Sequence, residues 1–380
     1  MTKPLRLDVV AALLARYALT LVGFVMAPLP RRHKVTMLTR QSSQPSSDFT
    51  MLADAIRERD PLADVVMIAR MVPPGIIAKV RYALHLVKEM YHVETSRVVV
   101  VDGYSMVVSA ARRTDGLTVV QMWHALGALK KFGLSILGRA GGRDPRLARA
   151  MRMHQGYDMV ITSAERGRAA FAEALGVTRD KVVVAPLPRV DRLRDPEERA
   201  KARAVFDGLY PELVGEKIAL FAPTFRVGNT PQDEQALEVT EALAGAGYAT
   251  VTKLHPLVPV PSHTSLRVAP GLSTQQMLLV ADVFVTDYSS AVFEAAVVGV
   301  PSYLYAPDRD LYVESRDFYM AYPDDLGLTM AMTAAELTEQ VASGACTPAD
   351  IAATAANHVV IPEFGTAAAT LAAVITGRRP

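Results

Sequence analysis

Residues 281–308 read ADVFVTDYSSAVFEAAVVGVPSYLYAPD and place a strand, a turn, a helix and a second strand in close succession. The apolar run Val283–Val285 is short, as expected of a strand enclosed on both faces. Ala291–Val298 is apolar nearly all round, with Glu294 as its one charge, which predicts a buried helix. The stretch therefore predicts a repeating unit of a parallel α/β sheet.

The turn inside this stretch is rich in hydroxyl groups, and Ser289 or Ser290 is predicted to cap the helix. A helix start leaves backbone N–H groups unpaired and carries the positive end of the helix dipole, so a phosphate bound there gains several donors. These residues alone leave two interpretations open. One is a phosphate-binding turn, and the other is an ordinary serine cap.

From Lys34 onward, short β-rich runs alternate with segments of helical spacing such as Phe49–Arg59 and Ile76–Tyr91. This alternation predicts parallel sheets with crossover helices. The predicted strands of the first set are Val35–Leu38, Val65–Ala69, Val98–Val101, Val119–Met122, Met159–Thr162 and Val182–Ala185. Those of the second set are Ile218–Ala222, Thr250–Leu254, Val283–Val285 and Tyr303–Tyr305.

The length of 380 residues is about twice that of a typical domain. Pro188, the charged run 192–203 and Gly208 indicate a linker between the two sets of strands. We therefore predict an α/β protein with two Rossmann-like domains, 34–200 and 201–380, that face a cleft and bind ligands at the carboxyl ends of their strands. The alanine-rich tail 352–373 is predicted to form closing helices of the second domain.

Composition excludes several classes of protein. The 41 basic and 39 acidic residues leave a formal charge of +2, so no electrostatic argument favours a nucleic-acid partner. A single cysteine, Cys346, excludes an intrachain disulfide framework and a thiolate zinc site and fits a reducing cytoplasm. Its simplest interpretation is a small apolar residue.

Residues 1–33 contain two apolar runs separated by Arg16, and the longer run is too short to span a bilayer, which needs roughly 20 residues. A signal peptide is disfavoured because no small-residue cleavage pattern precedes the basic residues 31–34. We predict a helix on the inner, cytoplasmic surface of the cell membrane; burial against the protein's own core is the alternative. The side chains expected to enter the lipid are Leu13, Leu14, Leu21 and Phe24.

Polar residues follow several of the predicted strands. His124 comes directly after one strand in the first half, with Lys130 and Lys131 close behind it. In the second half, Arg226 and His255 follow two more strands. Each residue alone is weak evidence, because histidines and lysines are common on folded surfaces. Together they indicate a site for phosphate contacts and proton transfer.

Six motifs then resemble one family, the CDP-glycerol glycerophosphotransferases of wall teichoic acid synthesis. Residues 121–133, QMWHALGALKKFG, are similar to its W-H-G-T-x-L-K-x-x-G signature, although Ala125 and Leu126 stand where Gly-Thr is usual. The other motifs fall in order between about residues 95 and 330. They are 187–191 (G-x-P-R-N-D), 222–226 (A-P-T-[WF]-R), 255–256 (K-x-H-P), 282–296 (D-x-x-x-T-D-Y-S-S-x-x-F-[ED]) and 315–319 (R-G-x-Y).

The resemblance implies a fold of the glycosyltransferase-B type and transfer of a polyol phosphate, most simply glycerol phosphate, from a CDP-polyol to a lipid-linked acceptor of the undecaprenyl-diphosphate type. CMP is the expected leaving group, and a homo-oligomer is compatible with this function. We expect His124 and His255 to be catalytic, with His124 as the general base on the acceptor hydroxyl. The predicted donor-binding residues are Arg226, Thr286, Asp287, Ser289, Ser290, Lys130 and Glu294.

No cofactor or metal site is predicted, because no Asp-x-Asp motif precedes the donor turn and basic side chains can stabilise the diphosphate instead. Two other functions fit the same residues. One is a glycosyltransferase that uses a nucleotide sugar. The other is a catalytically idle homologue that binds the membrane surface.

Overall fold

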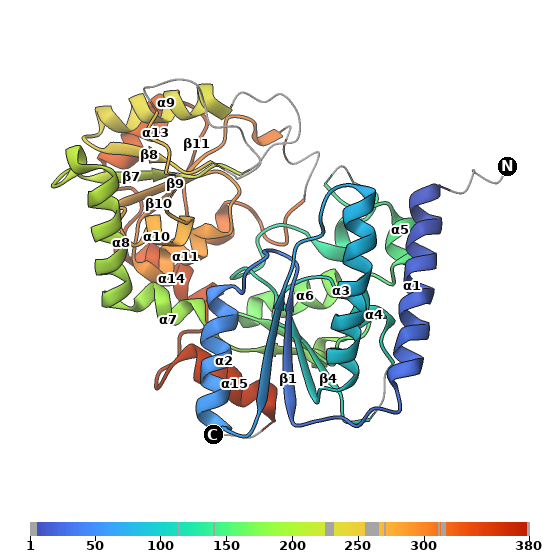
Figure 1. Ribbon diagram of the computed structural model, residues 1–380. Helices are drawn as coiled ribbons and strands as arrows, with labels where there is room; N and C mark the ends of the chain where they lie inside the picture. The colour runs from blue at the N-terminus through green and yellow to red at the C-terminus, as the bar shows by residue number, and fades with distance from the viewer. Residues whose placement is uncertain are drawn as a thin grey trace. The chain divides into compact units, whose positions relative to one another are not determined.

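The computed structural model describes residues 6–112, 115–139, 141–224, 232–254, 266–269, 271–310, 312 and 317–377. The chain divides into two compact units, each built around one parallel sheet (Figure 1). The first unit comprises Met1–Ala125, Lys131–Arg189 and Pro362–Pro380. The second comprises Leu126–Lys130 and Val190–Ile361.

The sheet of the first unit has the strand order β2-β1-β3-β4-β5-β6 and is parallel throughout. Most of its residues are apolar and buried, as expected of a sheet covered on both faces. The strands are β1 (Lys34–Thr39), β2 (Asp64–Ala69), β3 (Val98–Val101), β4 (Thr118–Gln121), β5 (Met159–Thr162) and β6 (Val182–Val184).

Helices pack on both faces of this sheet (Figure 1). They are α1 (Leu7–Met26), α2 (Ser47–Arg59), α3 (Ile76–Glu94), α4 (Met106–Ala110), α5 (Pro145–Ala150), α6 (Arg168–Leu175) and α15 (Ala367–Thr376). Helix α15 comes last in the chain but packs against α2, near the start. Its buried alanines and leucine bring the C-terminal segment back to the first unit.

The sheet of the second unit has the order β11-β10-β9-β7-β8 and is also parallel. Its strands are β7 (Ile218–Phe221), β8 (Ala249–Thr252), β9 (Val283–Thr286), β10 (Ser302–Tyr305) and β11 (Met330–Ala331). Its helices are α8 (Pro196–Leu209), α9 (Gln232–Gly245), α10 (Thr274–Leu278), α11 (Ala291–Val298), α13 (Ala334–Ala342) and α14 (Pro348–His358). Helix α7 (Arg189–Arg194) begins where the two units divide.

The predicted fold class is confirmed, because two parallel α/β sheets and an N-terminal apolar helix are present. All ten predicted strands are observed, most with ends shifted by a residue or two, whereas β11 was not predicted because two residues show no periodicity. The division of the chain differs from the predicted ranges. It falls after Arg189 rather than near residue 200, and the last segment, Pro362–Pro380, belongs to the first unit.

Helix α1 has two different faces. Val9, Ala12, Leu19 and Gly23 are buried, and the helix packs on α3, α4 and α5. Leu13 packs against this same cluster, so the prediction that Leu13 enters the membrane is not supported. By length and composition alone, the helix could cross a membrane. The opposite face is solvent-exposed, with Leu14 65%, Leu21 66% and Phe24 57% exposed.

Candidate active site

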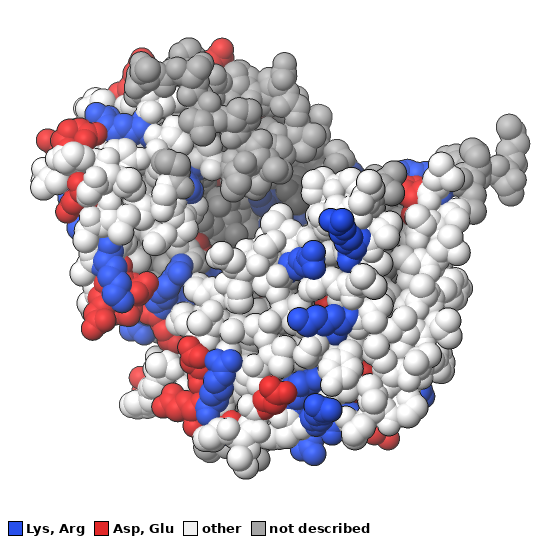
Figure 2. Space-filling view, viewed as in Figure 1, with Lys and Arg blue, Asp and Glu red and all other residues white. Residues whose placement is uncertain are grey.

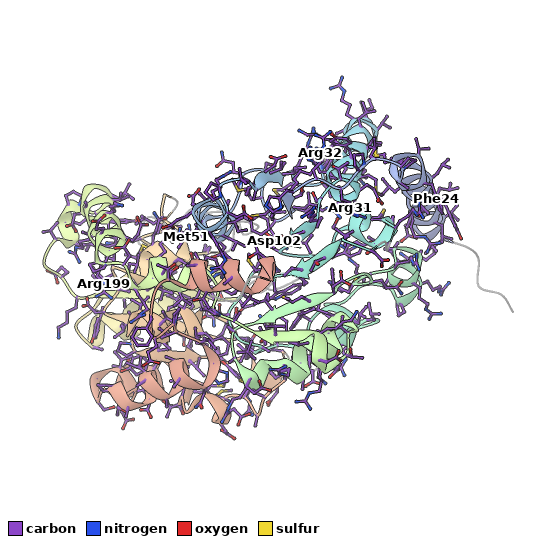
Figure 3. All side chains as sticks on the ribbon, turned by 90° about the horizontal axis from the view of Figure 1, so that it is seen from below. Phe24, Arg31, Arg32, Met51, Asp102 and Arg199 are labelled. Carbon is purple, nitrogen blue, oxygen red and sulfur yellow. The ribbon has the colours of Figure 1, made fainter. Side chains whose placement is uncertain are left out.

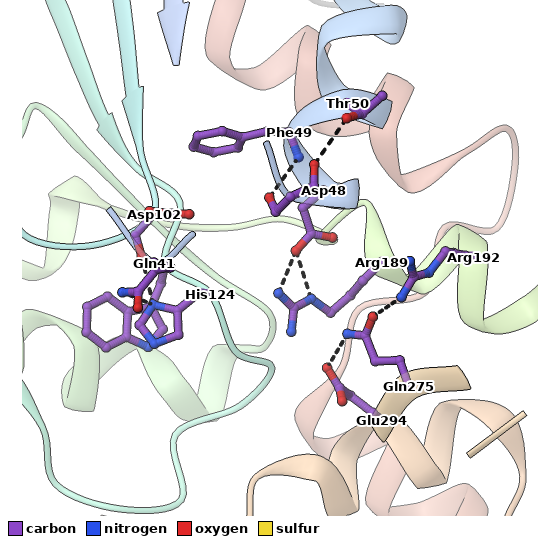
Figure 4. Close-up of polar contacts among 12 residues, drawn as sticks. Gln41, Asp48, Phe49, Thr50, Asp102, His124, Arg189, Arg192, Gln275 and Glu294 are labelled. Atoms are coloured by element: carbon purple, nitrogen blue, oxygen red, sulfur yellow. Dashed lines mark hydrogen bonds and ion pairs between the residues drawn. The ribbon is translucent and has the colours of Figure 1, made fainter. Parts of the chain in front are cut away.

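Three residues meet at the carboxyl edge of the first sheet. Strands β1, β3 and β4 are parallel neighbours, so the residues that follow them come to the same edge. The side chain of Gln41, the backbone of Asp102 and the ring of His124 lie together there (Figure 4). The sequence identified His124 but neither of the other two, for which position after a strand was the only available signal.

The ring of His124 is oriented from behind by the backbone. Its Nδ1 lies 2.7 Å from the carbonyl oxygen of Asp102. A carbonyl can only accept a hydrogen bond, so Nδ1 carries the proton and Nε2 of the neutral ring keeps a free lone pair. This tautomer gives the ring a base at Nε2.

The surroundings of His124 favour its neutral form. More than a third of the side chain is exposed, yet protein atoms surround the ring and displace much of its hydration. This burial lowers the pKa of His124 below the ordinary value, and the hydrogen bond to the Asp102 carbonyl, which acts in the opposite direction, does not cancel it. The ring is therefore neutral at pH 7.

The turn that presents His124 is fixed by its neighbour Trp123, whose backbone is left-handed with φ 63°. The Trp123 N–H donates to Gln121 Oε1 at 2.9 Å, and its ring stacks on Phe132 with centroids 4.6 Å apart. The Trp123 and His124 rings are 4.4 Å apart. These contacts hold the histidine on a rigid support.

Two buried carboxylates lie behind the histidine. Burial raises the pKa of Asp102 to about 6, although a hydrogen bond from Thr39 lowers it. Asp48 accepts from Arg189 Nε at 2.9 Å, and both residues are buried (Figure 4). Arg189 belongs to one of the predicted motifs, so the first unit uses this motif for a buried ion pair.

In the second unit, Thr286 and Asp287 are fully buried and act as supports. The Thr286 hydroxyl donates to the Ala222 carbonyl at 2.7 Å. The Asp287 carboxylate accepts from the Thr224 N–H, at 2.8 and 3.1 Å for its two oxygens, and from the Tyr288 N–H. Asp287 therefore joins the turn after β9 to the loop after β7. The structure shows this bracing for both predicted donor-binding residues.

The serines of the same turn are half-buried. The Ser289 hydroxyl accepts from the Ala291 N–H at 3.2 Å, while Ser290, the residue before α11, makes no side-chain cap. The prediction that one of them caps the helix therefore falls on Ser289. The hydroxyl of Ser290 is not used to cap α11 and remains a predicted phosphate contact.

Glu294 lies in the first turn of α11 and is 8% exposed. Its Oε1 accepts from Gln275 Nε2 at 2.8 Å, and Gln275 in turn accepts from Arg192 of α7 (Figure 4). This polar chain fixes the carboxylate of Glu294. Its donor-binding role stays a prediction.

Lys130 follows His124 closely in sequence but belongs to the second unit. Its Nζ donates to the Tyr312 hydroxyl at 3.3 Å, and the Tyr312 ring stacks on Tyr288 with centroids 3.8 Å apart. The neighbouring Leu129 carbonyl accepts from the Tyr319 N–H at 3.0 Å. The segment after the histidine is therefore docked on the second unit beside the turn that follows β9.

Gly127 makes this docking possible. Its φ is +61°, and a Cβ atom there would lie 2.3 Å from Cε2 of Phe293 on α11. The sequence suggested that replacing Gly-Thr by Ala125 and Leu126 removes a close backbone approach. The structure corrects this expectation, because Gly127 provides a close approach two positions later.

Arg226 and His255 lie outside the described residues, as do Ser315 and Arg316 of the last motif. The described chain stops at Thr224, which Asp287 holds, and at Leu254. Within the described ranges, no group of three or more His, Cys, Asp or Glu side chains is arranged to hold a metal ion.

Together these features define a two-unit α/β protein of the glycosyltransferase-B type. The chain belongs to the CDP-Glycerol:Poly(glycerophosphate) glycerophosphotransferase family, whose model matches residues 22–356, and it is an enzyme of the glycerophosphotransferase type. This confirms the resemblance seen in the sequence.

Two curated relatives and one solved structure support the assignment. The chain is 31% identical over 315 residues to a teichoic acid ribitol-phosphate primase of Bacillus spizizenii, which covers 80% of each chain. It is 26% identical to a teichoic acid glycerol-phosphate primase of Staphylococcus aureus, over 63% of this chain and 64% of the relative. The wall teichoic acid polymerase TagF shares the fold, with a TM-score of 0.71, 16% identity and 98% of both chains covered.

Proposed function

We propose that the protein transfers a polyol phosphate from a CDP-polyol to a hydroxyl of a lipid-linked acceptor and releases CMP. The observation that carries this proposal is the tautomer of His124, which leaves Nε2 as a base at a strand end. Glycerol phosphate is the group we favour from the sequence motifs. The ribitol-phosphate primase among the relatives makes ribitol phosphate the alternative.

His124 acts on the acceptor. Its Nε2 takes the proton of the acceptor hydroxyl as the oxygen attacks the β-phosphorus of the donor. A new phosphodiester forms, the bond from the β-phosphorus to the bridging oxygen breaks, and CMP leaves with the electron pair. A neutral histidine suits this step, because a protonated ring could not accept the proton.

The second unit holds the donor in this proposal. The start of α11 offers backbone N–H groups, and the half-buried Ser290 hydroxyl adds another donor for the diphosphate. Asp287 keeps the adjoining loop in place through Thr224. Arg226 and His255, which follow β7 and β8 in sequence, would add cationic contacts.

The test is CMP release by the purified full chain with a synthetic lipid-linked disaccharide as acceptor. CDP-glycerol and CDP-ribitol are compared with UDP- and GDP-sugars. CMP formation that depends on the acceptor, and falls about a thousandfold in His124→Ala, is the expected result. Release of UDP or GDP with sugar transfer would contradict the proposal, as would a fully active His124→Ala protein.

We further propose that the exposed face of α1 lies on the membrane surface, together with α3. The two helices pack against each other, and Ile77, Val80 and Leu84 of α3 are 77%, 66% and 75% exposed. Phe24 lies on the outside of α1, whereas Asp102 lies among the strands (Figure 3).

Charge supports the same orientation. Lys and Arg side chains gather over α3 beside the uncharged surface of α1 (Figure 2), and Lys79, Arg81 and Lys88 are exposed there. Basic residues around an apolar face favour contact with anionic lipid head groups.

Vesicles of anionic lipid test this orientation. The double substitution Leu14→Asp and Leu21→Asp should abolish sedimentation with the vesicles, because it places charge in the apolar face. Leu62→Asp is the matched control, since Leu62 is 87% exposed but lies on neither helix. Equal binding by all three proteins would show that this face does not contact lipid.

A further inference from the structure

Gln41 lies beside the proposed base with its carboxamide unused. Its Nε2 is 3.5 Å from Nδ1 of His124 (Figure 4), while Nδ1 already donates to the Asp102 carbonyl at 2.7 Å. The longer contact is weak, so it does not occupy the amide. Among the described residues, the Gln41 side chain has no other hydrogen bond. An exposed donor and acceptor pair is thus available next to the ring.

The place of this side chain is set by two neighbours. The Gln41 N–H donates to Thr39 Oγ1 at 3.2 Å, which fixes the backbone at the end of β1. A Cβ atom on Gly103 would lie 2.9 Å from Gln41 Nε2, so the amide occupies the space that this glycine leaves open. The amide therefore has a defined seat at the mouth of the site.

We propose that Gln41 binds the acceptor: its carboxamide hydrogen-bonds a hydroxyl of the acceptor polyol or sugar next to the hydroxyl that His124 deprotonates. This inference rests on the proposed function and adds a residue that selects the acceptor. A carboxamide both donates and accepts, which matches the hydrogen-bonding capacity of a hydroxyl. It is also neutral, so it does not shift the protonation of the adjacent ring as a lysine or glutamate would.

The first test compares steady-state kinetics of the full chain and Gln41→Ala. The acceptor is a synthetic lipid-linked disaccharide, and the donor is the CDP-polyol that the wild type uses. We expect the acceptor KM to rise about tenfold, while kcat and the donor KM change less than twofold. Gln44→Ala, an exposed glutamine on the same loop, is the matched control and should leave all three values unchanged.

A second variant displaces the amide without removing it. Gly103→Ala introduces a Cβ atom that contacts only the flexible end of the Gln41 side chain. We expect a smaller rise in the acceptor KM, about threefold, and no further rise when Gly103→Ala is added to Gln41→Ala. This loss of additivity is the signature of one shared contact.

The outcomes separate the two proposals. CMP release by the wild type, with an acceptor KM in Gln41→Ala within twofold of the wild-type value, would overturn this inference alone. Additive effects of the two substitutions would overturn it as well. A wild-type protein that releases no CMP from either CDP-polyol would overturn the proposed function, and this inference with it.

Discussion

The turns after β4 and after β9 are both polar and both follow buried strands, but they use their polar groups in opposite ways. His124 is exposed, and the Asp102 carbonyl holds its ring from behind, so that Nε2 is open to a substrate. Asp287 is fully buried, and backbone N–H groups of Thr224 and Tyr288 occupy its carboxylate. One turn presents a reactive group, and the other holds two loops together.

This difference separates two kinds of variant. Substitutions in the turn after β4 should change the reaction with little effect on folding. Substitutions of the buried residues after β9 should change stability first and activity only through the fold. The hydroxyls of Ser289 and Ser290 lie between these limits, since they are half-buried.

The largest expected effect on stability is that of Asp287→Ala. It leaves the buried N–H groups of Thr224 and Tyr288 without their acceptor, each at about 2 kcal/mol, so the free energy of unfolding should fall by about 4 kcal/mol. Urea denaturation followed by circular dichroism measures this change. A loss below about 1 kcal/mol would mean that the carboxylate is not a structural support.

Asp102→Asn tests the turn after β4 through pH. Burial raises the pKa of Asp102 to about 6, so the folded protein binds more protons than the unfolded chain between pH 4 and 6. Stability is therefore lost as pH rises through this range, by about 3 kcal/mol, and Asp102→Asn should remove that loss. Fluorescence of Trp123, the only tryptophan, follows unfolding of the first unit. The same pH slope in both proteins would contradict the assignment.

Gly127 and Gly299 form a matched pair in the second unit. Both have positive φ, but a Cβ atom at Gly127 would lie 2.3 Å from Phe293, whereas one at Gly299 meets nothing within 4 Å. Alanine should cost about 1 kcal/mol at Gly299 and about 3 kcal/mol at Gly127, where overpacking is added. Thermal denaturation of the two variants gives the difference. Equal losses would show that the segment after His124 is not docked on α11.

The smallest expected effect is that of Ser290→Ala. Its hydroxyl caps no helix, so stability should change by less than about 0.5 kcal/mol while the donor KM rises a few-fold. Ser289→Ala loses the bond from Ala291 and should cost about 1 kcal/mol. An unchanged donor KM in Ser290→Ala would remove this hydroxyl from the donor site.

Much of the fold could be predicted because buried parallel strands are short apolar runs, as at Val98–Val101 and Met159–Thr162, where the predicted and observed bounds agree. The return of α15 to the first unit could not be predicted, since an alanine-rich helix carries no signal for the surface it packs on.

The candidate site was predicted less completely. His124 was visible because an imidazole after a strand is unusual, but Gln41 and Asp102 have neighbours that depend on sheet order. Asp287 matched a donor motif, yet its bonding to Thr224 appears only in three dimensions. A motif therefore identified the turn but not the task of each residue within it.

The central claim, that His124 is a neutral base at pH 7, is tested most directly by the pH dependence of kcat/KM. Because burial lowers the pKa of His124, activity should be constant near pH 7 and should fall only as the pH drops below the ordinary histidine range. His124→Ala should lose this acid limb together with most of its rate. An acid limb above the ordinary histidine pKa, or one that persists unchanged in His124→Ala, would contradict the account.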